Sequence, residues 1–356
     1  MGSKHKEKML RVLIVEDSDV VSFLLTTIFE NETDLKVVGR AKNGLEAVRL
    51  NHELKPDVVT MDIRMPVMDG FEATRMIMSS DPVPIVVISS SVDDEELKIT
   101  FRAIEEGALA VIEKPVGFSN ASFESNRLEM LDTVRAMAEV KVIRHRFVKK
   151  NVINIFETAI SKEKKTYEVI AIGSSTGGPQ ALHALLASLP IGFPLPIVIA
   201  QHMSNGFISG LASWLNSNSL LTVIVAQDQQ LLKPGTVYIA PDDYHLLVAR
   251  NHNGLLTKLS HDQAPLNGFR PSATPLFNSV AQTCNNQGIG VLLTGMGVDG
   301  ASGLLTMRQA GSHTLAQDEA SSVVYGMPRA AVALGAVDQI VSLNNIAAYL
   351  LNLARQ

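Results

Sequence analysis

Short apolar runs alternate with helix-length segments through the first third of the chain. Three of them read RVLIV at 11–15, DVVTM at 57–61 and PIVVI at 84–88, with two further candidates at 36–41 and 109–112. Apolar runs without polar alternation are typical of strands that are buried on both faces. We therefore predict an α/β fold in which a parallel five-stranded sheet, in the flavodoxin-like order 2-1-3-4-5, is covered by helices on both sides.

Acidic side chains follow two of the predicted strands. Glu16 and Asp17 come directly after the first strand, and Asp62 ends the third. In the order 2-1-3-4-5 these residues converge at the switch point, where such sheets bind ligands. Three carboxylates repel one another unless a cation joins them, and hard oxygen ligands favour Mg²⁺. The cation would neutralise a phosphoryl donor and leave Asp62 as the attacking nucleophile.

Polar residues also follow the fourth and fifth strands, where Ser89 and Lys114 are placed to contact a transferred phosphate. Taken singly, these residues have simpler interpretations, with Asp17 or Asp19 as a helix cap and Lys114 as a surface charge. The combination is more specific, because residues 9–120 carry four motifs in order: VEDS, MDIRMPVMDG, VISSS and EKP. On these motifs the segment resembles the receiver domain of two-component response regulators.

The resemblance to receivers implies a site that is phosphorylated by a histidine kinase, with Asp62 as the phosphoryl acceptor. It implies four Mg²⁺ ligands: Glu16, Asp17, Asp62 and the backbone of Arg64. It also implies that the Lys114–Pro115 bond can be cis. One position departs from the family, since Val111 stands where an aromatic ring is usual. A rotamer switch of such a ring cannot carry the signal here, so the route from phosphate to output stays open.

The second half of the chain opens with a strand, a glycine-rich turn and a helix. The apolar run 168–172 leads into GSSTGGP, and a helical pattern follows from residue 180. A dinucleotide site would need G-x-G-x-x-G, but the glycines stand at 173, 177 and 178. The alternative is Gly173-x-Ser175-x-Gly177, which presents a serine hydroxyl on a sharp turn beside backbone N–H groups.

A serine nucleophile needs a base and an acid that orients it. His202 follows the next strand of this region, at 196–200, and Asp299 lies on the turn after the apolar run 289–293. Singly, Ser175 or Asp299 would be a helix cap and His202 a core or turn histidine. Three strand ends at one sheet edge favour the joint interpretation. The chain order Ser, His, Asp differs from that of α/β-hydrolases, which disfavours a lipase-like domain.

The remaining motifs of residues 168–352 closely resemble the effector domain of chemotaxis protein-glutamate methylesterases. They are IAIGSSTGGPQAL, QHM, YIAPDDYH, HDQAPLNGFRPS, LLTGMGVDGASG and AQDEASSVVYGMPRAA. The resemblance implies a doubly wound, mostly parallel α/β domain with Ser175 as the nucleophile, His202 as the general base and Asp299 as the orienting acid. It implies backbone oxyanion donors at Thr176 and Met296. Ser174 is the neighbouring competitor for the nucleophile.

This second resemblance also implies a substrate and a reaction. The family acts on glutamate γ-methyl esters of methyl-accepting chemoreceptors and releases methanol, and the same triad could deamidate receptor glutamines. No cofactor is expected for the esterase reaction. Phosphorylation of Asp62 is expected to relieve inhibition by the receiver, with the segment between the two domains as a hinge.

Charge divides the chain and narrows the classes of function. The net charge is −5, but residues 141–165 carry 8 basic and 2 acidic side chains, and residues 166–356 carry 7 basic and 9 acidic ones. We expect a receiver at 1–125, a helical and basic linker at 126–165 and a catalytic domain at 166–356. Sparse positive charge in the output domain disfavours a DNA-binding response regulator. The alternative is a catalytically silent signalling module that acts by protein binding.

Two further features bear on location and redox chemistry. The most apolar stretch, 186–200, is broken by prolines and a glycine, and no apolar core of signal-peptide length precedes the first strand. We therefore expect a cytoplasmic protein without membrane insertion. The single cysteine, Cys284, cannot form an internal disulfide and is expected to be a small buried helix residue.

Overall fold

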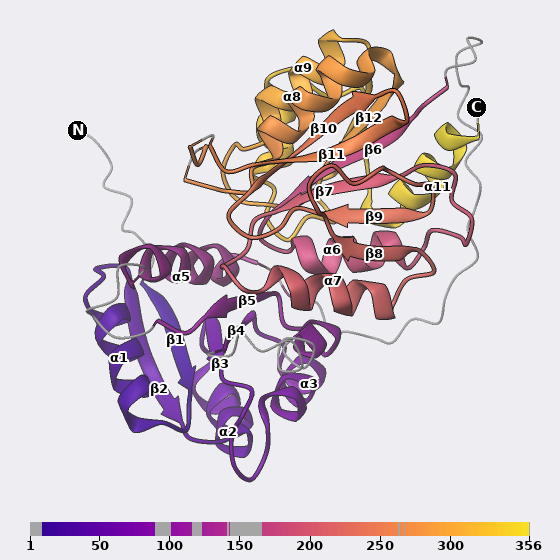
Figure 1. Ribbon diagram of the computed structural model, residues 1–356. Coiled ribbons are helices and arrows are strands. Elements are labelled where there is room, and N and C mark those ends of the chain that lie inside the picture. Colours follow the sequence, from indigo (N-terminus) through magenta and orange to yellow (C-terminus); the bar gives the residue numbers. More distant parts are fainter. Residues whose placement is uncertain are drawn as a thin grey trace. The chain divides into compact units, whose positions relative to one another are not determined.

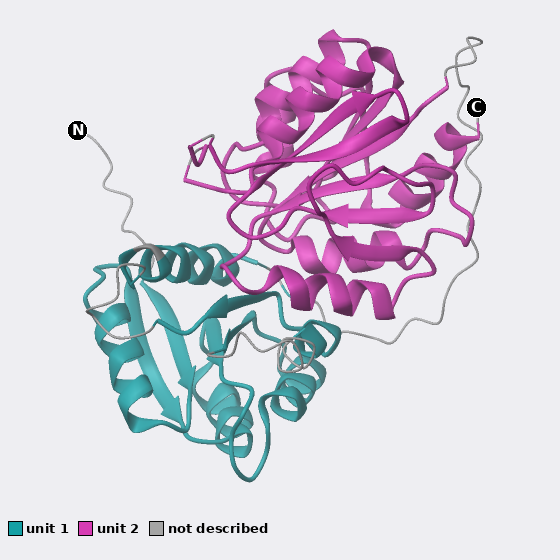
Figure 2. Cartoon of the chain, viewed as in Figure 1, with its two compact units in different colours: residues 1–147 teal, residues 148–356 magenta. Residues whose placement is uncertain are grey.

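The chain forms two compact units, residues 1–147 and 148–356, which are coloured separately in Figure 2. The computed structural model describes residues 9–89, 101–115, 123–140, 142, 166–262, 264–266 and 268–355. Helix α5 (Phe123–Ala138) spans the boundary expected at residue 125 and contacts strands of the first unit. Most of the basic segment 141–165 lies outside the described residues.

A five-stranded parallel sheet forms the centre of the first unit (Figure 1). Its strand order is β2-β1-β3-β4-β5, as the sequence predicts. The central strands are buried almost throughout, which explains why their sequences are continuously apolar. The strands are β1 (Leu10–Val15), β2 (Leu35–Ala41), β3 (Val58–Met61), β4 (Ile85–Ser89) and β5 (Ala110–Glu113).

Side-chain caps start the first three helices of this unit: α1 (Asp19–Glu30), α2 (Gly44–Leu54) and α3 (Gly70–Ser80). The cap of α1 is Ser18, whose hydroxyl accepts a hydrogen bond from the N–H of Val21. The alternative interpretation of Asp17 or Asp19 as this cap is therefore wrong. Asp17 is left without a capping role at the end of β1.

A seven-stranded parallel sheet forms the centre of the second unit, in the order β14-β13-β12-β6-β7-β9-β8. The order reverses direction between β12 and β7, with β6 in the middle, as in a doubly wound sheet. The strands are β6 (Val169–Ser174), β7 (Ile197–Gln201), β8 (Thr222–Val225), β9 (Thr236–Ile239), β12 (Gly288–Leu292), β13 (His313–Gln317) and β14 (Gln339–Val341).

Helices cover both faces of this sheet (Figure 1). One group contains α6 (Gly178–Leu186), α7 (Ile208–Ser217) and α11 (Leu343–Ala354), which contact one another through α6. The other contains α8 (Ala273–Cys284), the short helix η1 (Asn285–Gln287), α9 (Ala301–Gln309) and α10 (Met327–Ala333). An antiparallel hairpin, β10 (His245–Asn251) and β11 (Gly254–Ser260), packs against α8.

Apolar burial accounts for this arrangement of the second unit. Its main core cluster joins side chains of β6, β7, the hairpin, α8 and α9. Cys284 belongs to this cluster and is 2% exposed, and burial raises the pKa of its thiol to about 11. The expectation of a small buried helix residue is confirmed.

Candidate functional site

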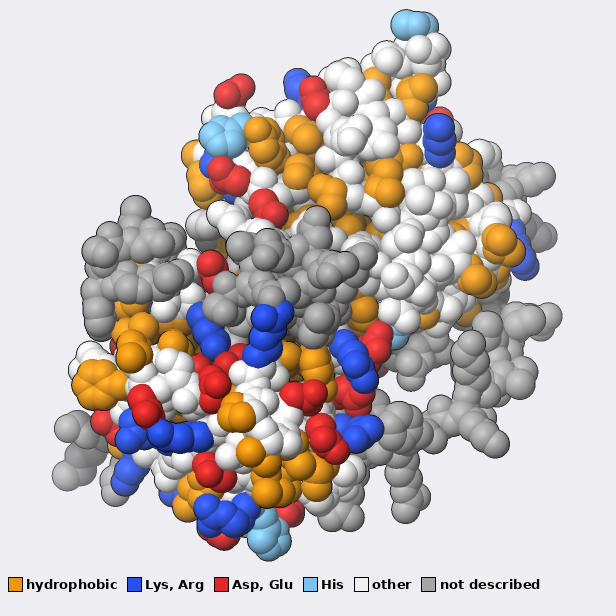
Figure 3. Space-filling model, turned by 60° about the horizontal axis from the view of Figure 1, so that its bottom comes forward, with side chains coloured by type: hydrophobic (Ala, Val, Ile, Leu, Met, Phe, Trp, Pro, Cys, Tyr) orange, Lys and Arg blue, Asp and Glu red, His pale blue; other side chains and the backbone are white. Residues whose placement is uncertain are grey.

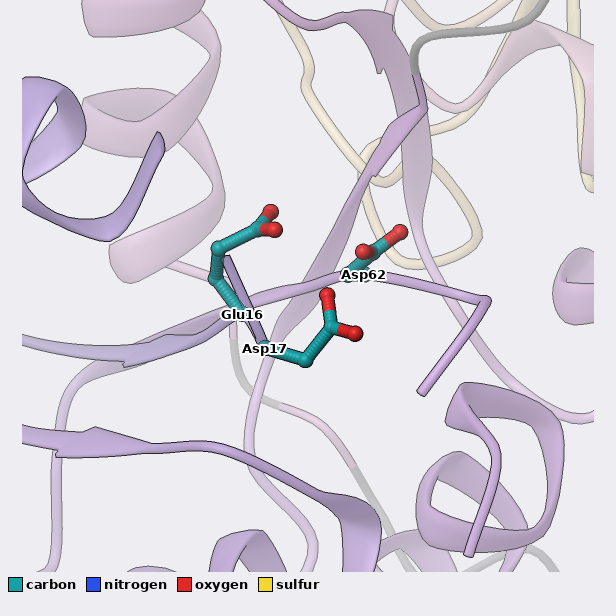
Figure 4. Close-up of side chains that lie close together, drawn as sticks. All are labelled: Glu16, Asp17 and Asp62. Atoms are coloured by element: carbon teal, nitrogen blue, oxygen red, sulfur yellow. The ribbon is translucent and has the colours of Figure 1, made fainter. Parts of the chain in front are cut away.

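Three carboxylates meet at the carboxyl ends of β1 and β3 in the first unit, as the sequence predicts. Oxygen atoms of Glu16, Asp17 and Asp62 all lie within 4.8 Å of one another. Figure 4 shows the three carboxylates around a common space. Glu16 and Asp62 are buried, whereas Asp17 is exposed. Three oxygen ligands at this spacing, one of them open to solvent, fit a hard divalent cation such as Mg²⁺.

Lys114 completes the charge arrangement of this acidic cluster. Its Nζ lies 2.8 Å from Oε2 of Glu16 and 2.8 Å from Oδ2 of Asp62. Burial lowers the pKa of Lys114, but hydrogen bonds to the two carboxylates outweigh burial and raise it. Burial also raises the pKa of Glu16, against the opposing effect of Lys114. Lys114 is therefore a half-buried counter-charge of the cluster, and its interpretation as a simple surface charge is wrong.

The other predicted groups of the first unit lie around Asp62. The Oδ1 atom of Asp62 accepts hydrogen bonds from the backbone N–H groups of Ile63 at 2.7 Å and Arg64 at 3.4 Å. Ser89 is buried at the end of the neighbouring strand β4. The Lys114–Pro115 bond is trans, since the cis bond among the described residues is Arg270–Pro271. The roles of Arg64 and Ser89 towards a metal or a phosphate stay predictions.

In the second unit, β6 ends at Ser174 and leads into a tight turn that begins with Ser175. Gly177 has φ of 77° and caps the start of α6. A Cβ atom at this glycine would lie 2.5 Å from Cβ of Val323, so both the backbone angle and the close approach require glycine. The N–H of Ser175 donates to the carbonyl of Thr294 at 3.1 Å. The turn is thereby fixed to the strand end that leads to Asp299.

The two serines of this turn differ in their surroundings. Ser174 is fully buried, and its hydroxyl donates to Oε1 of Gln201 at 2.6 Å. Ser175 is 8% exposed, and its hydroxyl makes no hydrogen bond within the described residues. The side-chain amide of Gln201 also donates to the carbonyls of Ser175 at 2.9 Å and His202 at 2.7 Å. Gln201 thus ties the serine turn to the histidine turn.

His202 and Asp299 form a buried pair. Nε2 of His202 lies 2.7 Å from Oδ2 of Asp299, and the two side chains are 3% and 2% exposed. The other ring nitrogen, Nδ1, is buried and has no hydrogen-bond partner among the described residues. A carboxylate only accepts, so the geometry assigns a proton to Nε2, and in the neutral tautomer the lone pair then lies on Nδ1. The N–H of His202 donates to the carbonyl of Ser174 at 3.0 Å, so the backbone that carries this imidazole adjoins the serine turn.

Asp299 is held at the amino-terminus of α8. Its Oδ1 accepts from the hydroxyls of Ser272 at 2.6 Å and Thr274 at 2.7 Å, and its Oδ2 accepts from the N–H of Ala273 at 2.7 Å. Burial raises the pKa of Asp299, but hydrogen bonds from His202, Ser272 and Thr274 outweigh burial and hold it well below its usual range. The carboxylate is therefore ionised at neutral pH.

The interpretation of Asp299 as the cap of α9 is wrong. Gly300 stands at that cap position and makes no side-chain hydrogen bond. Asp299 instead accepts from backbone N–H groups at the start of α8, whose cap is Ser272. The positive end of the α8 dipole adds to the stabilisation of this carboxylate.

The two backbone groups expected to bind an oxyanion lie on the turns that flank Ser175. Neither the N–H of Thr176 nor that of Met296 makes an internal hydrogen bond in the described part of the chain. Gly295, next to Met296, packs so closely that a Cβ there would lie 2.8 Å from Cβ of Ser175. The turn after β12 is therefore in contact with the serine, and both N–H groups are available to a bound ligand.

Several residues of this site were not predicted from the sequence: Gln201, Ser272, Thr274 and Phe269. Gln201 and Ser272 stand inside motifs that carried the family resemblance, but the hydrogen bonds from Gln201 to Ser175 and from Ser272 to Asp299 span 26 and 27 positions along the chain. The Phe269 ring stacks on His202 from a loop, with centroids 4.0 Å apart and an interplanar angle of 7°. No local pattern indicates such contacts between distant residues.

The surface differs between the two units. On the face in Figure 3, acidic and basic side chains crowd the first unit, whereas the second presents mostly uncharged side chains. This agrees with the few charged residues after residue 166. Among the described helices, none combines the length and the apolar character needed to cross a bilayer.

Comparisons with known proteins divide the chain into the same two parts. The family model of the response regulator receiver domain matches residues 12–121, and that of CheB methylesterase matches residues 170–350. A protein-glutamate methylesterase/protein-glutamine glutaminase 2 of Methanospirillum hungatei is 44% identical over 334 residues, which cover 92% of this chain and 93% of the relative. A similarly named protein of Myxococcus xanthus is 43% identical over 347 residues, 97% of each chain.

A solved structure covers the second unit. The CheB methylesterase catalytic domain of Thermotoga maritima is 37% identical, with a TM-score of 0.52, and the match covers 53% of this chain and 99% of that one. The predicted pairing of a receiver with a methylesterase-type effector domain is confirmed.

Proposed function

The chain belongs to the CheB methylesterase family, and we propose that it hydrolyses glutamate γ-methyl esters on chemoreceptors and releases methanol. The observation that carries the proposal is the buried His202–Asp299 pair, whose Nδ1 has no partner among the described residues, on a backbone that donates to the carbonyl of Ser174 at 3.0 Å. A module that acts by binding alone has no need of an ionised, buried carboxylate held on an imidazole. The silent-module alternative is not favoured.

In the proposed reaction Ser175 attacks the ester carbonyl and His202 takes the hydroxyl proton at Nδ1. Asp299 stabilises the imidazolium through Nε2, at 2.7 Å. The N–H groups of Thr176 and Met296 would bind the tetrahedral oxyanion. His202 then protonates the methoxide as it leaves, and water hydrolyses the glutamyl ester on Ser175. A glutamine amide follows the same route with ammonia as the leaving group, so we also propose deamidation.

The choice of Ser175 over Ser174 is supported by accessibility. The Ser174 hydroxyl is committed to Gln201 and fully buried, whereas Ser175 has a free hydroxyl and some exposure. The test is methanol release from methylated chemoreceptor membranes by wild type, Ser175→Ala and the matched control Ser174→Ala. We expect Ser175→Ala to abolish release and Ser174→Ala to retain it at a reduced rate. Full activity in Ser175→Ala would refute the proposed triad.

We further propose that phosphorylation of Asp62 by a histidine kinase regulates the esterase. Glu16, Asp17, Asp62 and the Arg64 carbonyl would hold the Mg²⁺, which supplies charge neutralisation for the incoming phosphoryl group. Asp62 supplies the attacking oxygen, and Lys114 and Ser89 would contact the phosphate. Because receptor methylation sites lie on cytoplasmic helices in this family, we place the reaction in the cytoplasm. Stimulation by a small phosphodonor should require Asp62 and be lost in Asp62→Asn.

A further inference from the structure

We propose that Phe269 is a positioning residue for His202, an inference that rests on the proposed function. The phenyl ring lies parallel to the imidazole, with centroids 4.0 Å apart and an interplanar angle of 7°. The contact covers one face of the imidazole and leaves both ring nitrogens free in the plane of the ring. Asp299 occupies Nε2, so the stack leaves Nδ1 as the open site.

The loop that carries Phe269 is held in place on both sides of the ring. Leu266 and Phe269 exchange two backbone hydrogen bonds, of 3.1 and 3.0 Å. The next residue, Arg270, donates to Oδ1 of Asp243 at 2.6 Å and to the carbonyl of His261 at 2.8 Å. The Leu266–Phe269 bonds close the loop locally, and the Arg270 bonds anchor it to the rest of the unit independently of His202. The loop can therefore hold the phenyl ring against the imidazole, so the contact does not depend on the two side chains alone.

Two physical effects follow from the stack. The imidazole can rotate about its Cβ–Cγ bond, and one hydrogen bond to Asp299 fixes only one atom of the ring. A parallel neighbour fixes the ring plane and so the direction of the Nδ1 lone pair. During attack the imidazole becomes a cation, and a cation over an aromatic face is stabilised. Both effects act on the chemical step and leave receptor binding unchanged.

Phe269 is suited to a direct test because it is 40% exposed and outside the main core cluster. Its truncation should leave the unit folded. Leu266, in the same loop and also 40% exposed, offers a matched control, since its contact with Phe269 runs through the backbone. The variants are Phe269→Ala, Phe269→Tyr, which keeps the ring, and Leu266→Ala, all made in the full chain.

The first readout is steady-state methanol release from methylated receptor membranes. We expect Phe269→Ala to lower kcat by about 5- to 30-fold, the range of a cation–π contact, with KM unchanged. Phe269→Tyr and Leu266→Ala should retain wild-type kcat. An unchanged kcat with a raised KM in Phe269→Ala would make the residue a receptor contact and overturn the inference.

The second readout does not depend on activity. Hydrogen–deuterium exchange at Cε1 of the His202 imidazole, followed by mass spectrometry, reports the access of solvent to the imidazole, which the stacked phenyl ring limits. We expect faster exchange in Phe269→Ala and wild-type exchange in Phe269→Tyr and Leu266→Ala. Unchanged exchange in Phe269→Ala would overturn the inference. If wild type releases no methanol at all, the proposed function fails, while this readout still decides whether Phe269 holds the imidazole.

Discussion

Replacing Asp299 by asparagine removes one negative charge from the site and nearly preserves its shape. On its Oδ1 side the carboxylate accepts from two hydroxyls and, at 3.3 Å, from the N–H of Thr274; on its Oδ2 side it accepts from the N–H of Ala273 and Nε2 of His202, both at 2.7 Å. Hydroxyls can turn and accept, whereas a backbone N–H cannot. The amide of Asp299→Asn should therefore direct its NH₂ group to Ser272 and Thr274 and its oxygen to His202. The histidine tautomer is expected to survive the change.

The expected fall in kcat of Asp299→Asn comes from the lost charge alone. Two unit charges about 4 Å apart attract by about 4 kcal/mol at an effective dielectric constant of about 20. The imidazolium formed during attack loses this attraction, which corresponds to a fall in kcat of about 10³-fold. Asp299→Ala also removes the orienting hydrogen bond, so we expect a larger loss, of about 10⁴-fold.

Stability gives a second, independent measure of the same carboxylate. The folded pKa of Asp299 lies below its unfolded value, so the ionised form stabilises the fold at pH values above the unfolded pKa, about 3.9. This contribution is lost as the pH falls through the folded pKa. Asp299→Ala leaves buried donors unpaired and should cost about 3–5 kcal/mol at pH 7. The difference from wild type should shrink below about pH 4.

Both quantities can be measured on the full chain. Trp214, the only tryptophan of the sequence, is buried in α7, so its fluorescence follows the unfolding of the second unit alone. Methanol release gives kcat, and Ser175→Ala serves as the inactive control with near wild-type stability. A folded Asp299→Asn protein with kcat within about threefold of wild type would refute the electrostatic role argued from the buried pair.

Three further outcomes follow from the two sites. Lys114→Gln should release methanol at the unstimulated wild-type rate, but a phosphodonor should no longer raise that rate. A titration with the phosphodonor would measure this, and retained stimulation would contradict the role of Lys114. Chelation of divalent cations should likewise remove only the stimulated fraction, and readdition of Mg²⁺ should restore it. Gly178→Ala would place a Cβ 2.0 Å from Oε1 of Gln201. We therefore expect the free energy of unfolding, measured by denaturant titration, to fall by about 1–3 kcal/mol. An unchanged free energy of unfolding would count against this packing.

The sheet and its acidic cluster were predictable because their signals are local. Continuous apolar runs mark buried parallel strands, and residues that follow such strands must share one sheet edge. Glu16 and Asp62 could therefore be placed together without knowledge of any side-chain contact. The same reasoning brought Ser175 and His202 to neighbouring strand ends, where β6 and β7 pair in register up to Ser174 and Gln201.

The residues that hold the proposed catalytic cluster in place could not be predicted by such reasoning. Asp299 was expected to cap α9 or to orient His202, and the sequence could not reveal that Ser272 and Thr274 at the start of α8 hold it. These contacts join residues 25 to 27 positions apart, across two different elements. The Phe269 stack depends on the path of an irregular loop, which periodicity does not determine. Hydrophobic patterns determine which strand ends meet, and through-space polar contacts then decide how each side chain is held.

Mass spectrometry of receptor peptides tests the central claim most directly, because it reads both proposed reactions at once. Methylated receptor is incubated with wild type or Ser175→Ala, with and without a phosphodonor. We predict that wild type removes one methylene mass from each methylated glutamate peptide and converts glutamine to glutamate, faster with donor, whereas Ser175→Ala changes neither. Receptor peptides that stay unchanged with phosphorylated wild type, or that lose their methyl groups equally with Ser175→Ala, would contradict the account.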